Sequence, residues 1–516
     1  MAKVGSRVVC HGEHGTVRFI GQVLPTKGLW LGIEWDNPER GLHDGNYKGK
    51  QYFNCTHPAG GSFVRMNKVN LGVNFLHALQ EKYASNEWLD NDCLPVGKGQ
   101  QKPVVFVGLE KVFQEQSHFD NLLQVSLSGY YVSSADPEGE VRHTCPNIED
   151  MYLAKHLLST WNELSKITIE LSHLHDLDLS ENRLQIPDNP SALANAFSNL
   201  RLLILNKCAI SWHQILQCAP MWPVLEELNI RCNGISTLSR PDGVLLTLKC
   251  LKLGDNKLTS NEDLLHLSYL PCLEVLYLDD NCLTDIAFPD VVAGHETSMF
   301  KQLMRLFISD NLISDWNSVN ELEKLPCLTE LKITFNSVIE KEQDSRTTRE
   351  LVVARVGGLR MLNLMPVSKK ERNKAEWAYV RRFGLEWQKA GGREEKGPSA
   401  EFLQLHPRYQ KLIEKFGAPE ESELQTSTRI MKDDLLPLYI LCPDHPTRKP
   451  IKKTFPSAMS IKRVKGLLTH LLKTKGCELS LSYVTQNSDD EFQMTTDEHT
   501  LHFYAIAPGN SLLVRW

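Results

Sequence analysis

Apolar side chains in the middle of the chain follow the pattern L-x-x-L-x-L-x-x-N-x-L, which recurs with substitutions. The clearest copy has Leu174, Leu177 and Leu179, followed by Asn182 and Leu184. Successive copies are 23 to 30 residues apart, and the residues at the asparagine position are Tyr130, His156, Asn182, Cys208, Asn233, Asn256, Asn281, Asn311 and Asn336. A repeat of this length predicts a solenoid of stacked units.

Each unit is expected to hold one short strand and one helix. The L-x-L core predicts a strand whose leucines point inward, and the asparagine amide can bond backbone groups left open by the next turn. The segment 261–267 starts with Asn261 and an acidic first turn, as helices do. We therefore predict an α/β leucine-rich-repeat solenoid over residues 116–366, capped by residues 367–390.

Solenoid strands line the concave side, here called the strand face, and such surfaces usually bind other macromolecules. The side chains expected to point outward from the later strands, as a protein-binding site, are Lys252, Asp255, Tyr277, Asp279, Asp280, Phe307 and Asp310. Aromatic residues beside a row of aspartates suit a partner with a basic and apolar surface. For each residue taken singly, the alternative is a solvated polar position.

The first 72 residues have a different sequence pattern, with many glycines, short runs of β-branched residues and frequent turn-forming residues. Three apolar runs predict strands of a small all-β barrel, at residues 8–10, 15–20 and 30–35. This module is locally basic, because residues 1–70 hold nine Lys and Arg against five Asp and Glu. A basic module on an acidic chain suits an acidic ligand.

Three runs in this module closely resemble a CAP-Gly domain: W-L-G-I-E-W-D at 30–36, G-L-H-D-G at 41–45 and G-G-S-F-V at 60–64. The resemblance implies a barrel over residues 1–72 that binds acidic carboxyl-terminal tails such as that of α-tubulin. The peptide groove that it implies consists of Trp30, Trp35, Gly41, Leu42, His43, Asp44, Gly45, Tyr52, Phe53 and Phe63. Each aromatic residue has ordinary barrel core as its alternative role.

One position departs from the family pattern. The binding loop of the family reads G-K-N-D-G, whereas this chain has Leu42 in place of the lysine and His43 in place of the asparagine. Leu42 cannot supply a cation for an acidic tail, but His43 can still donate a hydrogen bond. We therefore expect weaker and less salt-sensitive tail binding than in relatives that carry the lysine.

Two linkers and a last domain complete the predicted organisation. Residues 73–115 are expected to link the barrel to the solenoid, and residues 391–435 to form a second linker with one helical segment. Residues 436–516 show a pattern of strands around one helix that resembles a ubiquitin-like β-grasp domain. Its strands are expected at 438–441, 452–455, 479–484, 500–505 and 512–516, and its helix at 460–475. Since no terminal Gly-Gly is present, docking rather than conjugation is expected.

The composition and the absence of certain motifs argue against several classes of function. The net charge of −6 argues against a general nucleic-acid binder, and no apolar run is long enough for a membrane span. The thirteen cysteines include no C-x-x-C pair, which favours reduced thiols in the cytoplasm. No phosphate loop, metalloprotease motif or nucleophile elbow occurs, so we predict no catalytic residues, no metal site and no cofactor. His173 and His175 are expected to be structural.

The order of CAP-Gly domain, leucine-rich solenoid and ubiquitin-like domain closely resembles the tubulin-folding cofactor E family. The resemblance implies a non-enzymatic tubulin chaperone in the cytoplasm, associated with the cytoskeleton, that binds α-tubulin. It also implies that the protein acts together with the tubulin-folding cofactors B, C and D in assembling and dissociating α/β-tubulin heterodimers. Two alternatives stay open: a microtubule-binding adaptor, or a ubiquitin-pathway scaffold that contacts the proteasome through its last domain.

Overall fold

The computed structural model describes residues 2–83, 119–340, 345–420, 435–445, 448–457, 459–472, 474, 479–485 and 491–516. These residues fall into two compact units. The first unit contains residues 1–290, 297–312 and 325–328, and the second contains residues 291–296, 313–324 and 329–516. The predicted multidomain class is confirmed, with a small β barrel, an α/β solenoid and a β-grasp domain in this order.

The first unit begins with an antiparallel sheet in the order β1-β2-β3-β6. Its strands are β1 (Arg7–Cys10), β2 (Glu13–Gln22), β3 (Leu29–Trp35) and β6 (Gly61–Val64), beside a small hairpin of β4 (Asn46–Tyr47) and β5 (Lys50–Gln51). Short 3₁₀ turns follow at Pro38–Arg40 and Met66–Lys68. Val8, Val17, Leu31, Ile33 and Trp35 form its core, because alternate residues of each strand face inward.

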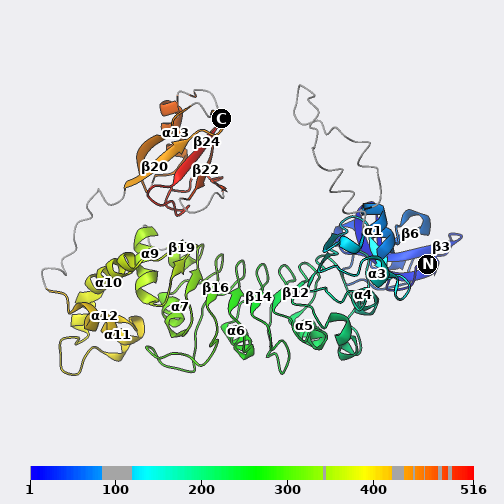
Figure 1. Cartoon of the computed structure of the whole chain (residues 1–516), viewed down its shortest axis with the longest axis horizontal. Helices are drawn as coiled ribbons and strands as arrows, with labels where there is room; N and C mark the ends of the chain where they lie inside the picture. The colour runs from blue at the N-terminus through cyan, green and yellow to red at the C-terminus, as the bar shows by residue number, and fades with distance from the viewer. Residues whose placement is uncertain are drawn as a thin grey trace. The chain divides into compact units, whose positions relative to one another are not determined.

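The repeats of the first unit contribute parallel strands of three residues each. They are β8 (Gln124–Ser126), β10 (Asp150–Tyr152), β11 (Asp176–Asp178), β12 (Leu202–Ile204), β13 (Glu227–Asn229), β14 (Cys250–Lys252), β15 (Val275–Tyr277) and β16 (Arg305–Phe307). The central leucines pair in register, as in Leu177 with Leu203 and Leu251 with Leu276. Figure 1 shows these strands side by side, with α5 and α6 on the other side of the repeats.

Asparagines, most of them buried, join successive turns, as predicted. The Asn256 amide donates to the carbonyl oxygens of Ile230, Leu253 and Gly254, and its oxygen accepts from the backbone N–H groups of Asn233 and Ile235. We call the row of Asn182, Asn233, Asn256, Asn281 and Asn311 the asparagine ladder. It satisfies backbone groups that the turns would otherwise leave buried without partners.

In two repeats another residue, Cys208 or His156, stands at the asparagine position and makes its own hydrogen bond to the backbone. The Cys208 thiol donates to Leu179 O at 3.3 Å, and burial raises its pKa to about 12, so it stays protonated. The ring of His156 is fully buried and its Nδ1 accepts from the backbone N–H of Val132 at 2.8 Å. Burial, aided by nearby His14, lowers the pKa of His156 to about 4, which keeps the ring neutral and able to accept.

Short helices lie between the strands: α3 (Glu140–Thr144), α4 (Trp161–Thr168), η5 (Pro190–Phe197), α5 (Trp212–Cys218), η6 (Ala219–Met221), α6 (Asn261–Leu265) and η7 (His266–Tyr269). Another 3₁₀ turn, η4 (Phe119–Asn121), precedes β8. The predicted helix at 261–267 is confirmed, but its cap lies one residue earlier. Ser260 Oγ accepts from the N–H of Asp263, and Asn261 is the first helical residue.

The barrel and the first repeats are joined by more than a linker. Within the predicted linker 73–115, β7 (Val73–Asn74) pairs with β9 (Val132–Ser134), and α1 (Phe75–Tyr83) follows; residues 84–115 lie outside the described residues. Asp36 of the barrel pairs with Arg7 of its own sheet and lies 3.4 Å from Nε of Arg183 in the repeats. The ring of buried His14 lies 5.7 Å from that of Tyr131.

The second unit carries the last repeat strands and a helical cap. Its elements are α7 (Trp316–Glu321), η8 (Leu322–Lys324), β17 (Glu330–Lys332), α8 (Ser337–Glu340), α9 (Ser345–Arg355), β18 (Met361–Leu362), β19 (Met365–Pro366), α10 (Lys369–Lys389), α11 (Ala400–Leu405) and α12 (Tyr409–Phe416). The sequence analysis predicts that the cap ends at residue 390. In the structure, however, Phe402, Tyr409 and Leu412 pack with Tyr379 and Trp387 in one core. The cap therefore continues to Phe416, because α11 and α12 bury their apolar sides there.

A buried carboxylate fixes this extension. Both oxygens of Glu376 on α10 accept from residues near or on α12, Arg408 at 2.8 Å and Lys415 at 2.6 Å. Burial alone would raise the pKa of the Glu376 carboxyl, but these bonds hold it below its usual range. Sequence periodicity does not reveal such a pair, since the partners are more than 30 residues apart.

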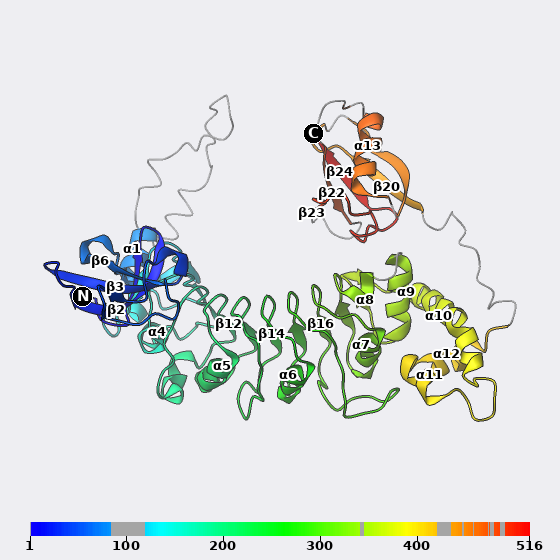
Figure 2. The ribbon, with the colours of Figure 1, turned by 180° about the vertical axis from the view of Figure 1, so that it is seen from behind.

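The carboxyl-terminal domain has a sheet in the order β21-β20-β24-β22-β23. The strands are β20 (Leu435–Leu441), β21 (Ile451–Pro456), β22 (Ser480–Val484), β23 (Glu491–Gln493) and β24 (Ser511–Arg515), and α13 (Ile461–Leu472) packs against them (Figure 2). The strand predicted at 500–505 is wrong, since residues 501–505 form turns with Leu501 in the core. The short β23 is the strand that the sequence missed.

Candidate peptide groove and strand face

The loop 41–45 of the barrel is held close to the start of β6. Leu42 N and Gly61 N donate across this junction to Gly61 O and His43 O, both at 2.7 Å. A Cβ atom at Gly41 would lie 1.9 Å from Ala59 O, and one at Gly45, where φ is +98°, would lie 2.0 Å from Phe53 O. The two glycines are therefore required by close approach and, at Gly45, by backbone conformation.

Around Phe63 the structure gathers an aromatic cluster. Ring centroids of Tyr52, Phe53 and His43 lie 5.5, 5.4 and 4.9 Å from that of Phe63. Phe19 and Tyr47, which the sequence did not single out, lie at 6.3 and 6.2 Å. Phe63 and Tyr52 are half-buried, so the cluster has an accessible side. We call Phe19, His43, Tyr47, Tyr52, Phe53 and Phe63 the aromatic groove, after the peptide groove that the resemblance implies.

Three of the residues expected in the groove have other roles. Trp35 is only 2% exposed and belongs to the barrel core, which corrects its assignment to the groove. Trp30 is covered by the guanidinium of Arg65, 3.8 Å from its ring centroid, and donates to Thr26 Oγ1. Asp44 accepts from the N–H of Asn46 at 3.1 Å and so fixes the turn.

His43 has the geometry of a donor to a ligand. Its Nδ1 accepts from the N–H of Gly45 at 3.0 Å, so in a neutral ring the proton is on Nε2. Burial lowers the pKa of His43 despite the opposing effect of Asp44, which favours this neutral form near pH 7. The Nε2–H group is then available for a peptide oxygen, in the role expected from the sequence.

Two lysines beside the groove change its electrostatics. Lys48 Nζ lies 5.6 Å from the Tyr47 ring and Lys50 Nζ lies 5.1 Å from the Tyr52 ring. Both lysines are exposed on the β4–β5 hairpin, whereas Leu42 in the loop is 81% exposed and uncharged. The sequence pattern drew attention to the missing lysine at position 42, and the hairpin cations were missed because no motif marks them.

The predicted strand-face residues divide into two groups. Lys252 and Tyr277 lie on neighbouring strands, with Lys252 Nζ 5.5 Å from the Tyr277 ring, which is half-buried. Phe307 stacks on Tyr277 at 4.3 Å and 5° but is only 6% exposed. Phe307 therefore lies beside Tyr277 on the same face of the strands, but it is buried there and supports the Tyr277 ring from the side.

The aspartates of this set have a local explanation. Asp255, Asp280 and Asp310 all have φ near +55°, the left-handed conformation that aspartate tolerates better than most residues. Asp255 also pairs with Arg231 at 2.5 Å. Asp279 is buried and accepts from the N–H of Ser309 at 3.0 Å, so its expected exposure is wrong too. The row of aspartates thus results from the turn geometry of the repeats.

Within the described residues, one group of side chains offers ligand atoms close enough for a metal ion: Asp150, His175 and Asp176. It lies on the first repeats of the strand face, away from the residues predicted there. Among the described helices, none is both long and apolar enough to cross a membrane.

Comparisons with known proteins agree with this architecture. The CAP-Gly domain family matches residues 4–69. A tubulin-specific chaperone E from Danio rerio is 44% identical over 518 residues, which cover 99% of this chain and 99% of the relative. The human tubulin-specific chaperone E is 42% identical over 522 residues, which cover 99% of this chain and 98% of the relative. The chain belongs to the tubulin-specific chaperone E family.

Membership in this family supports a role as a tubulin chaperone and confirms the predicted combination of domains. Among solved structures, the ubiquitin-like domain of mouse tubulin-specific chaperone e is 36% identical. That match covers 18% of this chain and 93% of the mouse domain, with a TM-score of 0.16.

Proposed function

We propose that this chaperone binds α-tubulin at two places, the acidic tail in the aromatic groove and the folded body on the strand face. The observation that carries the proposal is the cluster of rings around Phe63, together with a histidine donor and two exposed lysines. Aromatic rings can pack against the end of a peptide, while the cations attract its carboxylates. Such a site binds a ligand and does not require catalytic chemistry.

Two linked contacts explain how binding could act on a tubulin dimer. A tethered second contact is intramolecular, so two modest affinities combine into strong avidity without further contacts. To dissociate a dimer, the chain must bind α-tubulin alone more strongly than α-tubulin in the dimer. We propose that it does so in the cytoplasm, in association with the cytoskeleton, together with the tubulin-folding cofactors B, C and D.

The decisive experiment mixes the purified full chain with α/β-tubulin and follows dimers by size-exclusion chromatography. A complex with α-tubulin, or a loss of dimer that depends on the other cofactors, supports the proposal. Binding to microtubules with no effect on free dimers would instead indicate an adaptor. Loss of the main activity on removal of residues 436–516 alone would indicate the ubiquitin-pathway alternative, with the proteasome as its contact.

Replacing Leu42 by lysine is expected to tighten binding of an α-tubulin tail peptide. An exposed ion pair is worth about 0.2–1 kcal/mol, so affinity should rise roughly 1.5- to 5-fold at low salt. The Leu42 side chain is solvent-exposed while its backbone is held by Gly61, so the change should not disturb the loop. Fluorescence anisotropy at two salt concentrations measures the effect, which should shrink as salt screens the pair. Equal or weaker binding at low salt would show that Leu42 makes an apolar contact with the tail.

Removing the hairpin cations is expected to weaken tail binding. In a Lys48→Gln/Lys50→Gln protein, two exposed attractions of about 0.2–1 kcal/mol each are lost, so the Kd should rise roughly 2- to 30-fold at low salt. A Lys3→Gln/Lys68→Gln protein is the matched control, because it loses the same charge at exposed positions outside the aromatic groove. If both double variants weaken binding equally, net charge rather than the hairpin attracts the tail.

A further inference from the structure

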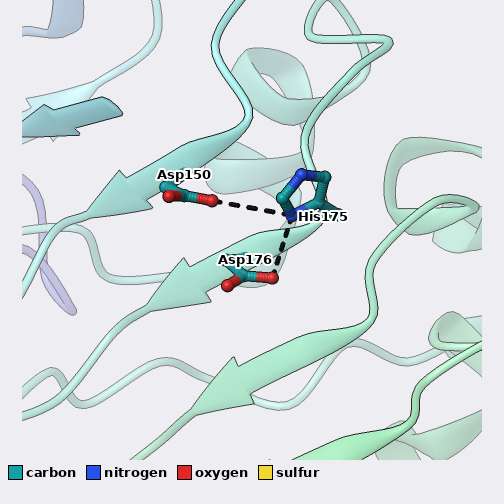
Figure 3. Close-up of side chains that lie close together, drawn as sticks. All are labelled: Asp150, His175 and Asp176. Atoms are coloured by element: carbon teal, nitrogen blue, oxygen red, sulfur yellow. Dashed lines mark hydrogen bonds and ion pairs between the residues drawn. The ribbon is translucent and has the colours of Figure 1, made fainter. Parts of the chain in front are cut away.

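We propose that Asp150, His175 and Asp176 form a binding site for a divalent transition-metal ion, with Zn²⁺ as the ion that fits best. The site lies where β10 and β11 run side by side, with Asp150 directly opposite Asp176. His175 immediately precedes β11, and its imidazole points between the two carboxylates (Figure 3). It is independent of the peptide groove and of the strand-face residues named above.

The ligand atoms have the spacing that a small ion requires. Nδ1 of His175 lies 2.9 Å from Asp176 Oδ1 and 3.5 Å from Asp150 Oδ1, and all three atoms are within 4.8 Å of one another. Zinc binds nitrogen and oxygen at about 2.0–2.2 Å, so neighbouring ligands of one ion are roughly 3–4 Å apart. Small side-chain rotations are enough to bring the three atoms to one ion.

A second observation comes from the burial of Asp150. This residue is only 8% exposed, and its Oδ1 makes no hydrogen bond although it points toward His175. A buried carboxylate oxygen that lies 3.5 Å from the His175 Nδ1 without a hydrogen bond is costly, and two aspartates facing each other across a strand pair repel. A bound cation would remove both penalties.

Neighbouring side chains supply the outer contacts that metal sites usually have. Gln124 Nε2 donates to the other oxygen of Asp150 at 2.5 Å, which fixes the carboxylate. Glu149 Oε2 lies 3.8 Å from Nε2 of His175, on the side away from the aspartates. A metal-bound histidine commonly directs its second N–H to a carboxylate, which orients the ring and makes it a better ligand.

The donor set favours zinc over the harder cations. One imidazole and two carboxylates suit a borderline ion, whereas calcium and magnesium prefer oxygen ligands alone. His175 and Asp176 are partly exposed, so a fourth position is open to water or to an oxygen atom of a bound protein. The alternative without metal is a protonated His175 that bridges the two aspartates as an ion pair.

The test uses Zn²⁺ alone with the full chain after removal of metals by a chelator. Competition with a chromogenic zinc indicator gives the affinity, and X-ray absorption gives the ligand types. The variants are His175→Gln and Asp176→Asn, and circular dichroism checks that each remains folded. His173→Gln is the matched control, because His173 is exposed two residues away and is outside the cluster.

We expect the wild-type and His173→Gln proteins to bind one equivalent more tightly than either site variant, by at least tenfold. The zinc ion at this site should be coordinated by nitrogen and oxygen only. Coordination by sulfur would instead indicate binding at the exposed cysteines Cys232, Cys272 and Cys282. Equal affinity in wild-type and His175→Gln proteins, or a first shell dominated by sulfur, would overturn the proposal and leave His175 as an ion-pair bridge.

Discussion

An Asn256→Ala protein is expected to lose about 3–5 kcal/mol of folding stability in its repeats. The substitution removes five hydrogen bonds between Asn256 and the backbone, in a side chain that is almost fully buried. Each bond contributes about 1 kcal/mol net, and buried groups left without a partner add to the loss. Denaturant unfolding followed by circular dichroism at 25 °C measures the change.

Hydrogen exchange locates the same effect. The N–H groups of Asn233 and Ile235 donate to Asn256, so their protection should fall more than that of distant repeats. Asn195→Ala is the control, since Asn195 is exposed on the outer 3₁₀ segment η5. A loss below about 1 kcal/mol, or an equal loss in the control, would mean that the asparagine ladder is not a main source of repeat stability.

A Tyr277→Ala protein is expected to bind tail-less α/β-tubulin about 30-fold more weakly. Tyr277 presents an aromatic ring on the strand face, stacked against Phe307 of the neighbouring strand and approached by Lys252. Aromatic residues supported in this way dominate protein interfaces, and truncation of one typically costs about 2 kcal/mol or more. Tubulin without its acidic tails removes the contribution of the aromatic groove, and fluorescence anisotropy gives the Kd.

Tyr269→Ala is the matched control for this measurement. Tyr269 is an exposed tyrosine of η7 in the segment that precedes β15, and Arg240 covers its ring at 3.7 Å. Phe307→Ala is unsuitable, because removal of a buried phenylalanine costs about 3–5 kcal/mol of stability and would confuse folding with binding. If Tyr277→Ala and wild type bind alike, the strand face near β15 is not the contact with the tubulin body.

The repeats could be predicted from the sequence because their constraint is local and periodic. Buried leucines and ladder asparagines must recur at each turn, so the strands of the solenoid follow from spacing alone. The CAP-Gly loop was equally clear, since Gly41 and Gly45 occupy places where a side chain would collide with backbone. In both cases one residue type is dictated by its immediate surroundings.

Exposure and long-range contacts could not be predicted in this way. Whether Trp35 lies in the core and Phe307 is buried beside Tyr277 depends on packing between strands that are distant in sequence. The predicted cap was too short because Arg408 and Glu376 are in contact in the fold but distant in sequence. The false strand at 500–505 arose because apolar residues can enter a core from a turn, as Leu501 does.

The junction of the barrel with the repeats has a consequence for experiments that shorten the chain. The strand pairing of β7 with β9 and the contact of His14 with Tyr131 shield the outer edge of the solenoid near buried His156. A fragment starting after residue 72 would keep β7 but lose His14 and Asp36, so water would reach Tyr131 and Arg183 would lose its partner. A loss of tubulin binding by this fragment would therefore have two possible causes, a destabilised solenoid and the absence of the aromatic groove. Point substitutions in the groove, in an otherwise intact chain, separate the two.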